Sequence, residues 1–90
     1  MAEHQKLYLY RHGSDTDAIG NDTVRLFSDK ERAIRYMRDQ IEEYYECSWD
    51  DFVDRYSSNC NNVVEHTYVE IAEYNWTNYY MVDSVKVDAA

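Results

Sequence analysis

Seven carboxylates occur between residues 39 and 54, and no lysine or arginine lies among them. They are Asp39, Glu42, Glu43, Glu46, Asp50, Asp51 and Asp54. Dense negative charge attracts basic surfaces over long range and repels nucleic acid and anionic membranes. The chemistry that this segment predicts is therefore electrostatic binding to a positively charged protein.

A second group of acids suggests a metal site. Asp15-x-Asp17-x-x-Gly20 matches the opening of a calcium loop, in which alternate carboxylates surround the ion and a glycine makes the sharp turn. Ile19 stands where an oxygen ligand belongs, and Leu26 stands where the bidentate glutamate belongs. We interpret the segment as an ordinary Asp/Gly turn and expect no metal and no cofactor.

Arg11, His12 and Gly13 follow the alternating residues 7–10. This run resembles, over about seven residues, the strand-end RHG signature of the histidine phosphatase and phosphoglycerate mutase superfamily. The resemblance implies that His12 takes a phosphoryl group and that Arg11 binds the phosphate. No other segment repeats the family's pattern, and the acids of the following loop oppose the positive potential that a phosphate pocket needs. We expect a strand that ends in a turn with a solvent-facing His12, and no enzymatic activity.

Composition limits the other classes. Ninety residues form a single domain, 1–90. Hydrophobic residues make up 44% of the chain and aromatic residues 16%, which is enough apolar surface to form a core. The 18 acids and 9 bases give a net charge of −9. No apolar run is long enough for a signal peptide or a membrane span, so we expect a cytoplasmic protein without a membrane partner. The spacing of Cys47 and Cys60 indicates neither zinc nor a disulfide framework, and we expect reduced thiols.

The first half of the chain predicts two strands and two helices. Residues 6–11 alternate, with Leu7 and Leu9 on one face and Tyr8 and Tyr10 on the other, and residues 23–27 form a second short strand. A capping box, in which Ser28 is the N-cap, and apolar residues at three- and four-residue steps predict a helix over about 29–46. Ser48 and Asp51 form a second box, and the shorter helix that follows ends near Ser57.

The second half predicts two longer strands, over 63–74 and 79–87, where β-branched and aromatic residues are frequent. Residues 75–78 connect them as a hairpin. The fold class is therefore α+β in the order ββααββ. We expect a roughly four-stranded antiparallel sheet with both helices on one face.

Local helix physics explains only part of the acidic run. Residues 1–38 carry six acids and seven bases, whereas residues 39–90 carry twelve acids and two bases. Asp50 and Asp51 lie in a first helical turn, which favours acids, but Glu42, Glu43 and Glu46 lie at a helix C-terminus, where each costs about 0.3 to 1 kcal/mol. Pairs such as Arg35 with Asp39 and Arg38 with Glu42 offset some of this cost. Helix stability therefore does not account for these glutamates.

Acids at three- and four-residue steps recur every ~4.5 to 6 Å along a helix, a spacing comparable to that of phosphates along a nucleic-acid strand. In size, acidity and α+β pattern the chain resembles, as a class, the small anti-CRISPR and anti-restriction inhibitors of phages and mobile elements. The resemblance implies an inhibitor that mimics nucleic acid and occupies the basic nucleic-acid-binding site of a protein such as a CRISPR effector or a restriction enzyme. The predicted binding residues are the seven acids, with Tyr44 or Tyr45 where exposed.

Two alternatives remain open. The acidity could belong to an immunity-type or accessory interaction domain without mimicry, or to a solvated face selected for solubility or for a salt-rich habitat. The ten tyrosines exceed what a core of this size requires. Since tyrosine is favoured in interfaces, a Tyr-rich sheet face could serve a homodimer as well as a different partner.

Overall fold

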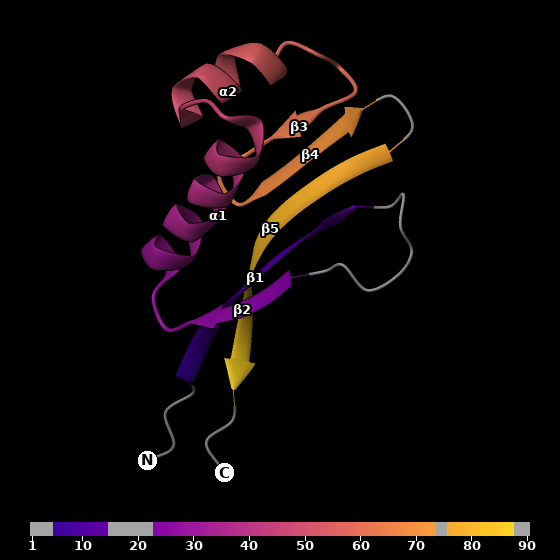
Figure 1. Ribbon diagram of the computed structural model, residues 1–90. Coiled ribbons are helices and arrows are strands. Elements are labelled where there is room, and N and C mark those ends of the chain that lie inside the picture. The colour runs from indigo at the N-terminus through magenta and orange to yellow at the C-terminus, as the bar shows by residue number, and fades with distance from the viewer. Residues whose placement is uncertain (1–4, 15–22, 74–75, 88–90) are drawn as a thin grey trace.

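The computed structural model describes residues 5–14, 23–73 and 76–87. The described part contains two helices and five strands (Figure 1). The strands are β1 (Gln5–Ser14), β2 (Thr23–Phe27), β3 (Val63–Val64), β4 (Tyr68–Glu73) and β5 (Trp76–Val87), and the helices are α1 (Lys30–Tyr45) and α2 (Trp49–Tyr56). The predicted α+β class, with an antiparallel sheet and two helices, is confirmed. The order is ββααβββ, however, and not ββααββ.

All five strands form one antiparallel sheet in the order β2-β1-β5-β4-β3. The two long strands, β1 and β5, are its centre and are paired along their whole common length, from Gln5 opposite Val87 to Ser14 opposite Asn78. Their lower ends extend beyond both helices as a two-stranded ribbon (Figure 1). The short strands β2 and β3 are the two edges.

The fifth strand arises because the predicted strand over 63–74 folds back on itself. Val63 pairs with Glu70 and Val64 with Val69, which makes β3 and β4 a small hairpin. The Glu65 amide donates to the Tyr68 carbonyl at 2.7 Å, so the turn satisfies its own backbone. The turn contains no glycine or proline, and β-branched residues occur on both sides of it. The sequence pattern therefore looks like one continuous strand.

Side-chain caps begin both helices. Ser48 is the N-cap of α2 as predicted, and its hydroxyl accepts a hydrogen bond from the Asp51 amide. The N-cap of α1 is Asp29 and not Ser28, because the Asp29 carboxylate accepts from the Glu31 amide at 3.1 Å. An acid at this position also interacts favourably with the positive end of the helix dipole.

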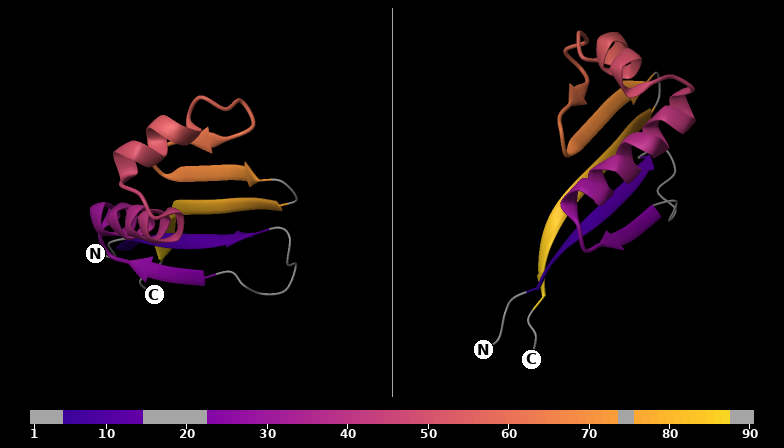
Figure 2. Two further views of the ribbon diagram at one scale, coloured as in Figure 1. Left: turned by 45° about the horizontal axis from the view of Figure 1, so that its top comes forward. Right: turned by 90° about the vertical axis from the view of Figure 1, so that its left-hand side faces the viewer.

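Both helices cover the same face of the sheet (Figure 2). The buried side chains lie between these layers: from the sheet Tyr10, Val69, Ile71, Tyr80 and Val82, and from the helices Ala33, Ile34, Met37, Ile41 and Phe52. Strand alternation therefore turns Tyr8 and Tyr10 toward the helices and Leu7 and Leu9 toward the other side, which we call the open sheet face. Leu26 of the edge strand lies on that open face and is 59% exposed.

Truncating one aliphatic side chain in the core and one on the open sheet face tests which side of the sheet is buried. Ile41→Ala removes a fully buried side chain, and we expect it to lower the free energy of unfolding by about 2 to 5 kcal/mol. Leu26→Ala removes a similar volume from the open face, and we expect a loss below about 1 kcal/mol. Urea unfolding followed by circular dichroism measures both. Equal losses would contradict this assignment of the core.

Candidate functional site

Six of the seven predicted acids are exposed to solvent, on the outer sides of the two helices and at the C-cap of α1. In α1 the buried residues Met37 and Ile41 face the sheet, and 3.6 residues per turn place Asp39 and Glu43 on the opposite side. In α2 the buried Phe52 similarly places the aspartates outward. We call this surface the acidic ridge, and it consists of Asp39, Glu43, Glu46, Asp50, Asp51 and Asp54, all of them exposed.

The seventh acid, Glu42, has a structural role that the sequence analysis missed. Its side chain is half-buried, and its Oε2 accepts a hydrogen bond from the Trp49 amide at 2.6 Å. A carboxylate at this point satisfies a backbone donor in the first turn of α2 and interacts favourably with the helix dipole. Glu42 therefore fixes α2 against α1. It was predicted to bind a partner, but its carboxylate is already engaged within the fold.

Glu46 has an unusual backbone for a glutamate. It follows the last residue of α1 with φ 55° and ψ 46°, in the left-handed region that normally favours glycine, and it is the one described non-glycine residue with positive φ. The Cys47 amide donates to the Glu42 carbonyl at 3.3 Å, as in a Schellman motif. The same residue places a negative charge at the negative end of the helix dipole. Both local effects oppose glutamate at this position.

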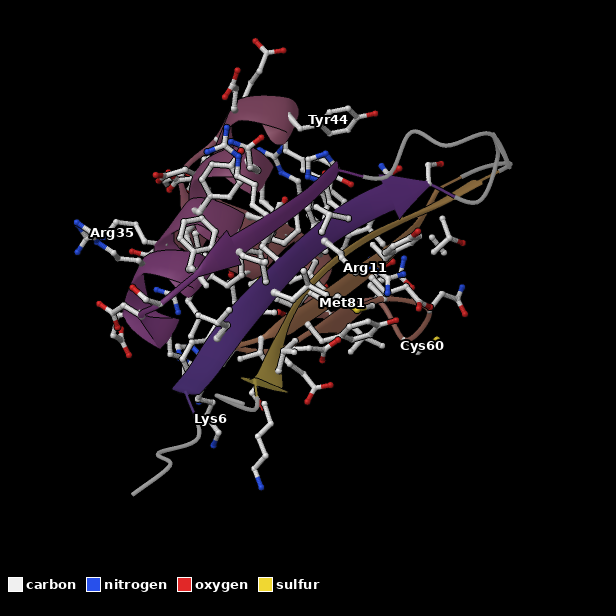
Figure 3. All side chains as sticks on the ribbon, turned by 90° about the horizontal axis from the view of Figure 1, so that it is seen from below. Lys6, Arg11, Arg35, Tyr44, Cys60 and Met81 are labelled. Atoms are coloured by element: carbon white, nitrogen blue, oxygen red, sulfur yellow. The ribbon has the colours of Figure 1, made fainter. Side chains whose placement is uncertain are left out.

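The two predicted tyrosines have different surroundings. Tyr44 is 59% exposed and projects from the last turn of α1 (Figure 3). Tyr45 is half-buried, its ring packs against Phe52 and Tyr56, and its hydroxyl accepts a hydrogen bond from Asn78 Nδ2 at 3.1 Å. Tyr44 is thus available for binding beside the acidic ridge, whereas Tyr45 holds the two helices and β5 together.

Arg38 joins three elements on the side of α1 that faces α2. Its guanidinium lies 4.9 Å from the centre of the Trp49 ring, and its Nη2 is 3.1 Å from Nδ1 of His66, which is in the β3–β4 turn. Its Nε is buried and has no hydrogen-bond partner. A cation over an aromatic ring contributes about 0.5 to 2 kcal/mol, so this contact helps to fix α2 on α1. Sequence spacing alone predicted a pair with Glu42 and gave no signal for this three-way contact.

The residues of the RHG segment lie in the middle of the sheet. Arg11 and His12 are consecutive residues of β1, which is paired with both β2 and β5. Because successive side chains of a strand alternate, these two project to opposite faces of the sheet. The His12 ring lies on the helix side, half-buried, with Nδ1 hydrogen-bonded to the Tyr10 hydroxyl and the ring near that of Tyr80. Burial raises the pKa of Tyr10 above its ordinary value, and the neighbouring Tyr36 adds to this effect. The expected solvent-facing His12 was wrong, and the two side chains do not meet at one phosphate.

A polar pair lies on the open sheet face. The Tyr68 hydroxyl donates a hydrogen bond to Glu70 Oε1 two residues along β4. This hydrogen bond and, to a lesser extent, desolvation and the negative charges of Glu70 and Glu65 raise the pKa of Tyr68 to about 12. The phenol therefore stays neutral to a higher pH than an ordinary tyrosine does.

The metal prediction can be examined only in part. The calcium-like segment 15–20 lies outside the described residues. Within the described ranges, no three His, Cys, Asp or Glu side chains are grouped so that they could hold a metal ion. Cys47 is half-buried and Cys60 is exposed, and neither forms a disulfide.

The comparisons with known proteins identify no relative. No protein-family model matches the chain, and no curated protein and no solved structure is significantly similar to it. No helix in the described part of the chain is long and apolar enough to cross a membrane. Function must therefore be inferred from the surfaces of the molecule itself.

Glu46→Gly tests whether the acidic ridge costs stability. Glycine adopts positive φ without strain, and the substitution removes a charge from a helix C-terminus, so we expect the free energy of unfolding to rise by about 1 kcal/mol or more. Glu43→Gly removes the same side chain from within α1, and we expect a loss of about 1 kcal/mol instead. Chemical denaturation compares the two. A less stable Glu46→Gly protein would mean that the Glu46 carboxylate has a structural partner.

A titration tests the Tyr68–Glu70 pair. The folded pKa of Tyr68 lies above the unfolded value of 10.0, so this interaction stabilises the protein fully below pH 10 and is lost as the pH rises toward 12. We expect Glu70→Gln to move the Tyr68 pKa back toward 10, because the largest cause of the shift is removed. The chemical shift of the Tyr68 ring carbons in NMR reports this pKa. An unchanged pKa in the variant would exclude Glu70 as the cause.

Proposed function

We propose that this chain is a non-enzymatic, protein-binding inhibitor whose acidic ridge occupies the basic nucleic-acid-binding site of a partner, for example a CRISPR effector or a restriction enzyme. The observation that carries the proposal is the outward, exposed arrangement of six carboxylates, five on two adjoining helices and one, Glu46, at the C-cap of α1. One of them, Glu46, is kept where both the backbone and the helix dipole oppose it. Residues in sparsely populated backbone regions cluster at active sites, ligand-binding clamps and switch regions.

The spacing of the charges suits this role. A rise of about 1.5 Å per residue separates Asp39 from Glu43 by ~6 Å and Asp50 from Asp54 by the same distance. One strand of a duplex carries a phosphate about every 3.4 Å of axis, so the charge density agrees within a factor of about two. A basic groove that binds phosphates would attract such a ridge over long range and speed the encounter.

The ridge is held rigidly. The Glu42–Trp49 hydrogen bond, the Arg38–Trp49 contact and the packing of the Tyr45 ring against rings of α2 all join α1 to α2. The acids of the two helices therefore keep one arrangement before a partner arrives. Binding then requires less ordering of the helices, which is the main advantage of a preorganised surface.

The ridge also has defined limits. Arg32 and Arg35 are exposed in the first half of α1, and Arg55 is exposed in the last turn of α2. These bases flank the acids in the sequence and would repel a basic groove that extended over them. Tyr44, exposed beside Glu43, offers a flat apolar contact next to the charges, as interface tyrosines commonly do. The predicted contact is therefore small and centred on the junction of the two helices.

Charge reversal tests the proposal. Glu43→Lys with Asp54→Lys changes the ridge by +4 units of charge and spares the Glu42 carboxylate that caps α2. Glu31→Lys with Glu65→Lys changes the net charge equally at two exposed acids outside the ridge. Each protein is used as bait in a lysate of the native host, and partners are quantified by mass spectrometry. We expect a basic nucleic-acid-binding protein to be retained by the native chain and the control and lost, by tenfold or more, from the ridge variant.

Competition identifies the kind of binding. Added DNA or RNA should displace that partner, and high salt should release it, because screening weakens attraction between exposed charges. A partner that stays bound in the presence of nucleic acid would exclude mimicry and favour an immunity-type or accessory interaction domain. Equal recovery of the partner by the native chain and the ridge variant would exclude the acidic ridge as the binding site.

A further inference from the structure

The open sheet face carries apolar side chains from every strand. Alternation and the strand register place them together: Leu7, Leu9, Val24, Leu26, Val63, Tyr68, Tyr79, Met81 and Val85. Val24 is 53% and Leu26 is 59% exposed, and the others are half-buried. Both helices lie on the opposite side of the sheet (Figure 2). A contiguous apolar surface of this kind usually marks an interaction site.

The open sheet face is broad. β1 and β5 are paired over ten residues, so the face is about 34 Å long at its centre, and five strands about 4.8 Å apart make it ~20 Å wide. A standard protein–protein interface buries about 800 Å² of each partner, which is comparable to the area of this face.

The charges on this face are few and of both signs. It carries Arg11, Glu70 and Asp83, a net charge of −1, whereas the whole chain carries −9. Arg11 lies beside Met81 near the middle of the face (Figure 3). A basic partner would gain little attraction here. A surface with a central arginine and neighbouring carboxylates is complementary to itself.

We propose that a second copy of this chain covers the open sheet face, in a symmetric dimer with the two sheets packed face to face. Closed two-fold dimers are the commonest protein assemblies and require a self-complementary patch. On the open face Leu9 and Asp83 form one row across β1 and β5, and Arg11 and Met81 form the next row. A two-fold axis that lies between the two sheets and crosses the strands midway between these rows places each row opposite the other row of the second copy. Arg11 of one protomer then lies opposite Leu9 of the second copy and diagonally across from its Asp83 on the neighbouring strand, within reach of the long arginine side chain, twice in the dimer.

The remaining rows also match in this arrangement. Rows on one face are two residues apart, or ~6.8 Å along the strands, so the row of Leu7 and Val85 meets the row of Gly13 and Tyr79. On the edge strand Val24 meets Leu26. Apolar side chains therefore face apolar side chains, while the glycine leaves room for a larger neighbour. The acidic ridges lie on the far sides of the two sheets, so the dimer is independent of the proposed function and would present two ridges.

Light scattering during size-exclusion chromatography tests the dimer. At about 100 µM we expect the native chain to elute with twice its 10.8 kDa mass. Leu26→Lys introduces a charge into the open face, and Tyr44→Lys introduces the same charge at a side chain that is equally exposed, 59%, on α1. We expect the first variant to be monomeric and the second to remain dimeric. Leu26 is exposed, so the variant should keep its fold, which circular dichroism verifies.

A charge exchange tests the proposed axis. Arg11→Asp alone and Asp83→Arg alone place like charges diagonally across the interface from each other and should weaken the dimer by tenfold or more, whereas the double variant should restore most of the loss. A native chain that is monomeric at 100 µM would overturn the proposal, even if the face then bound another protein. A dimer that persists in Leu26→Lys and in Met81→Lys would show that the copies meet elsewhere.

Discussion

The pairing of β1 with β5 is the constraint on which the rest of the structure depends. These strands come from opposite ends of the sequence and form the centre of the sheet, with β2 and β4 added on either side. Tyr10 and Val82, which face each other across this pair, form the floor on which α1 packs. Contacts between distant segments are slow to form because a long loop must close first. The core is therefore complete only when the last strand has joined the first.

Much of the fold could be predicted from local patterns. The alternation of residues 6–11, the apolar spacing of residues 33–45 and the Ser48 cap each depend on near neighbours, and the structure contains the corresponding elements. The hairpin of β3 and β4 could not be predicted because no turn residue marks it. Which face of β1 is buried also could not be predicted, since leucines and tyrosines alternate and only the position of the helices decides between them.

In the candidate site, too, the features that depend on near neighbours could be predicted, and those that depend on contacts between elements could not. The exposure of Asp39, Glu43 and the three aspartates of α2 follows from helical periodicity, which the sequence contains. The cap that Glu42 provides could not be predicted, because it joins a residue of one helix to the start of the next and depends on the angle between them. The left-handed backbone of Glu46 was hidden for a related reason, since the residue that usually marks such a turn is glycine.

The β1–β5 ribbon also determines how the protein can be attached to anything else. Gln5 pairs with Val87, so the polypeptide enters and leaves the sheet through neighbouring strands at one end (Figure 1). Helix α2 lies at the other end of the molecule. A tag, a fluorophore or a fused domain joined before Gln5 or after Val87 therefore connects to the sheet at the end remote from α2. The two attachment points are close enough for the whole unit to be inserted into a surface loop of another protein.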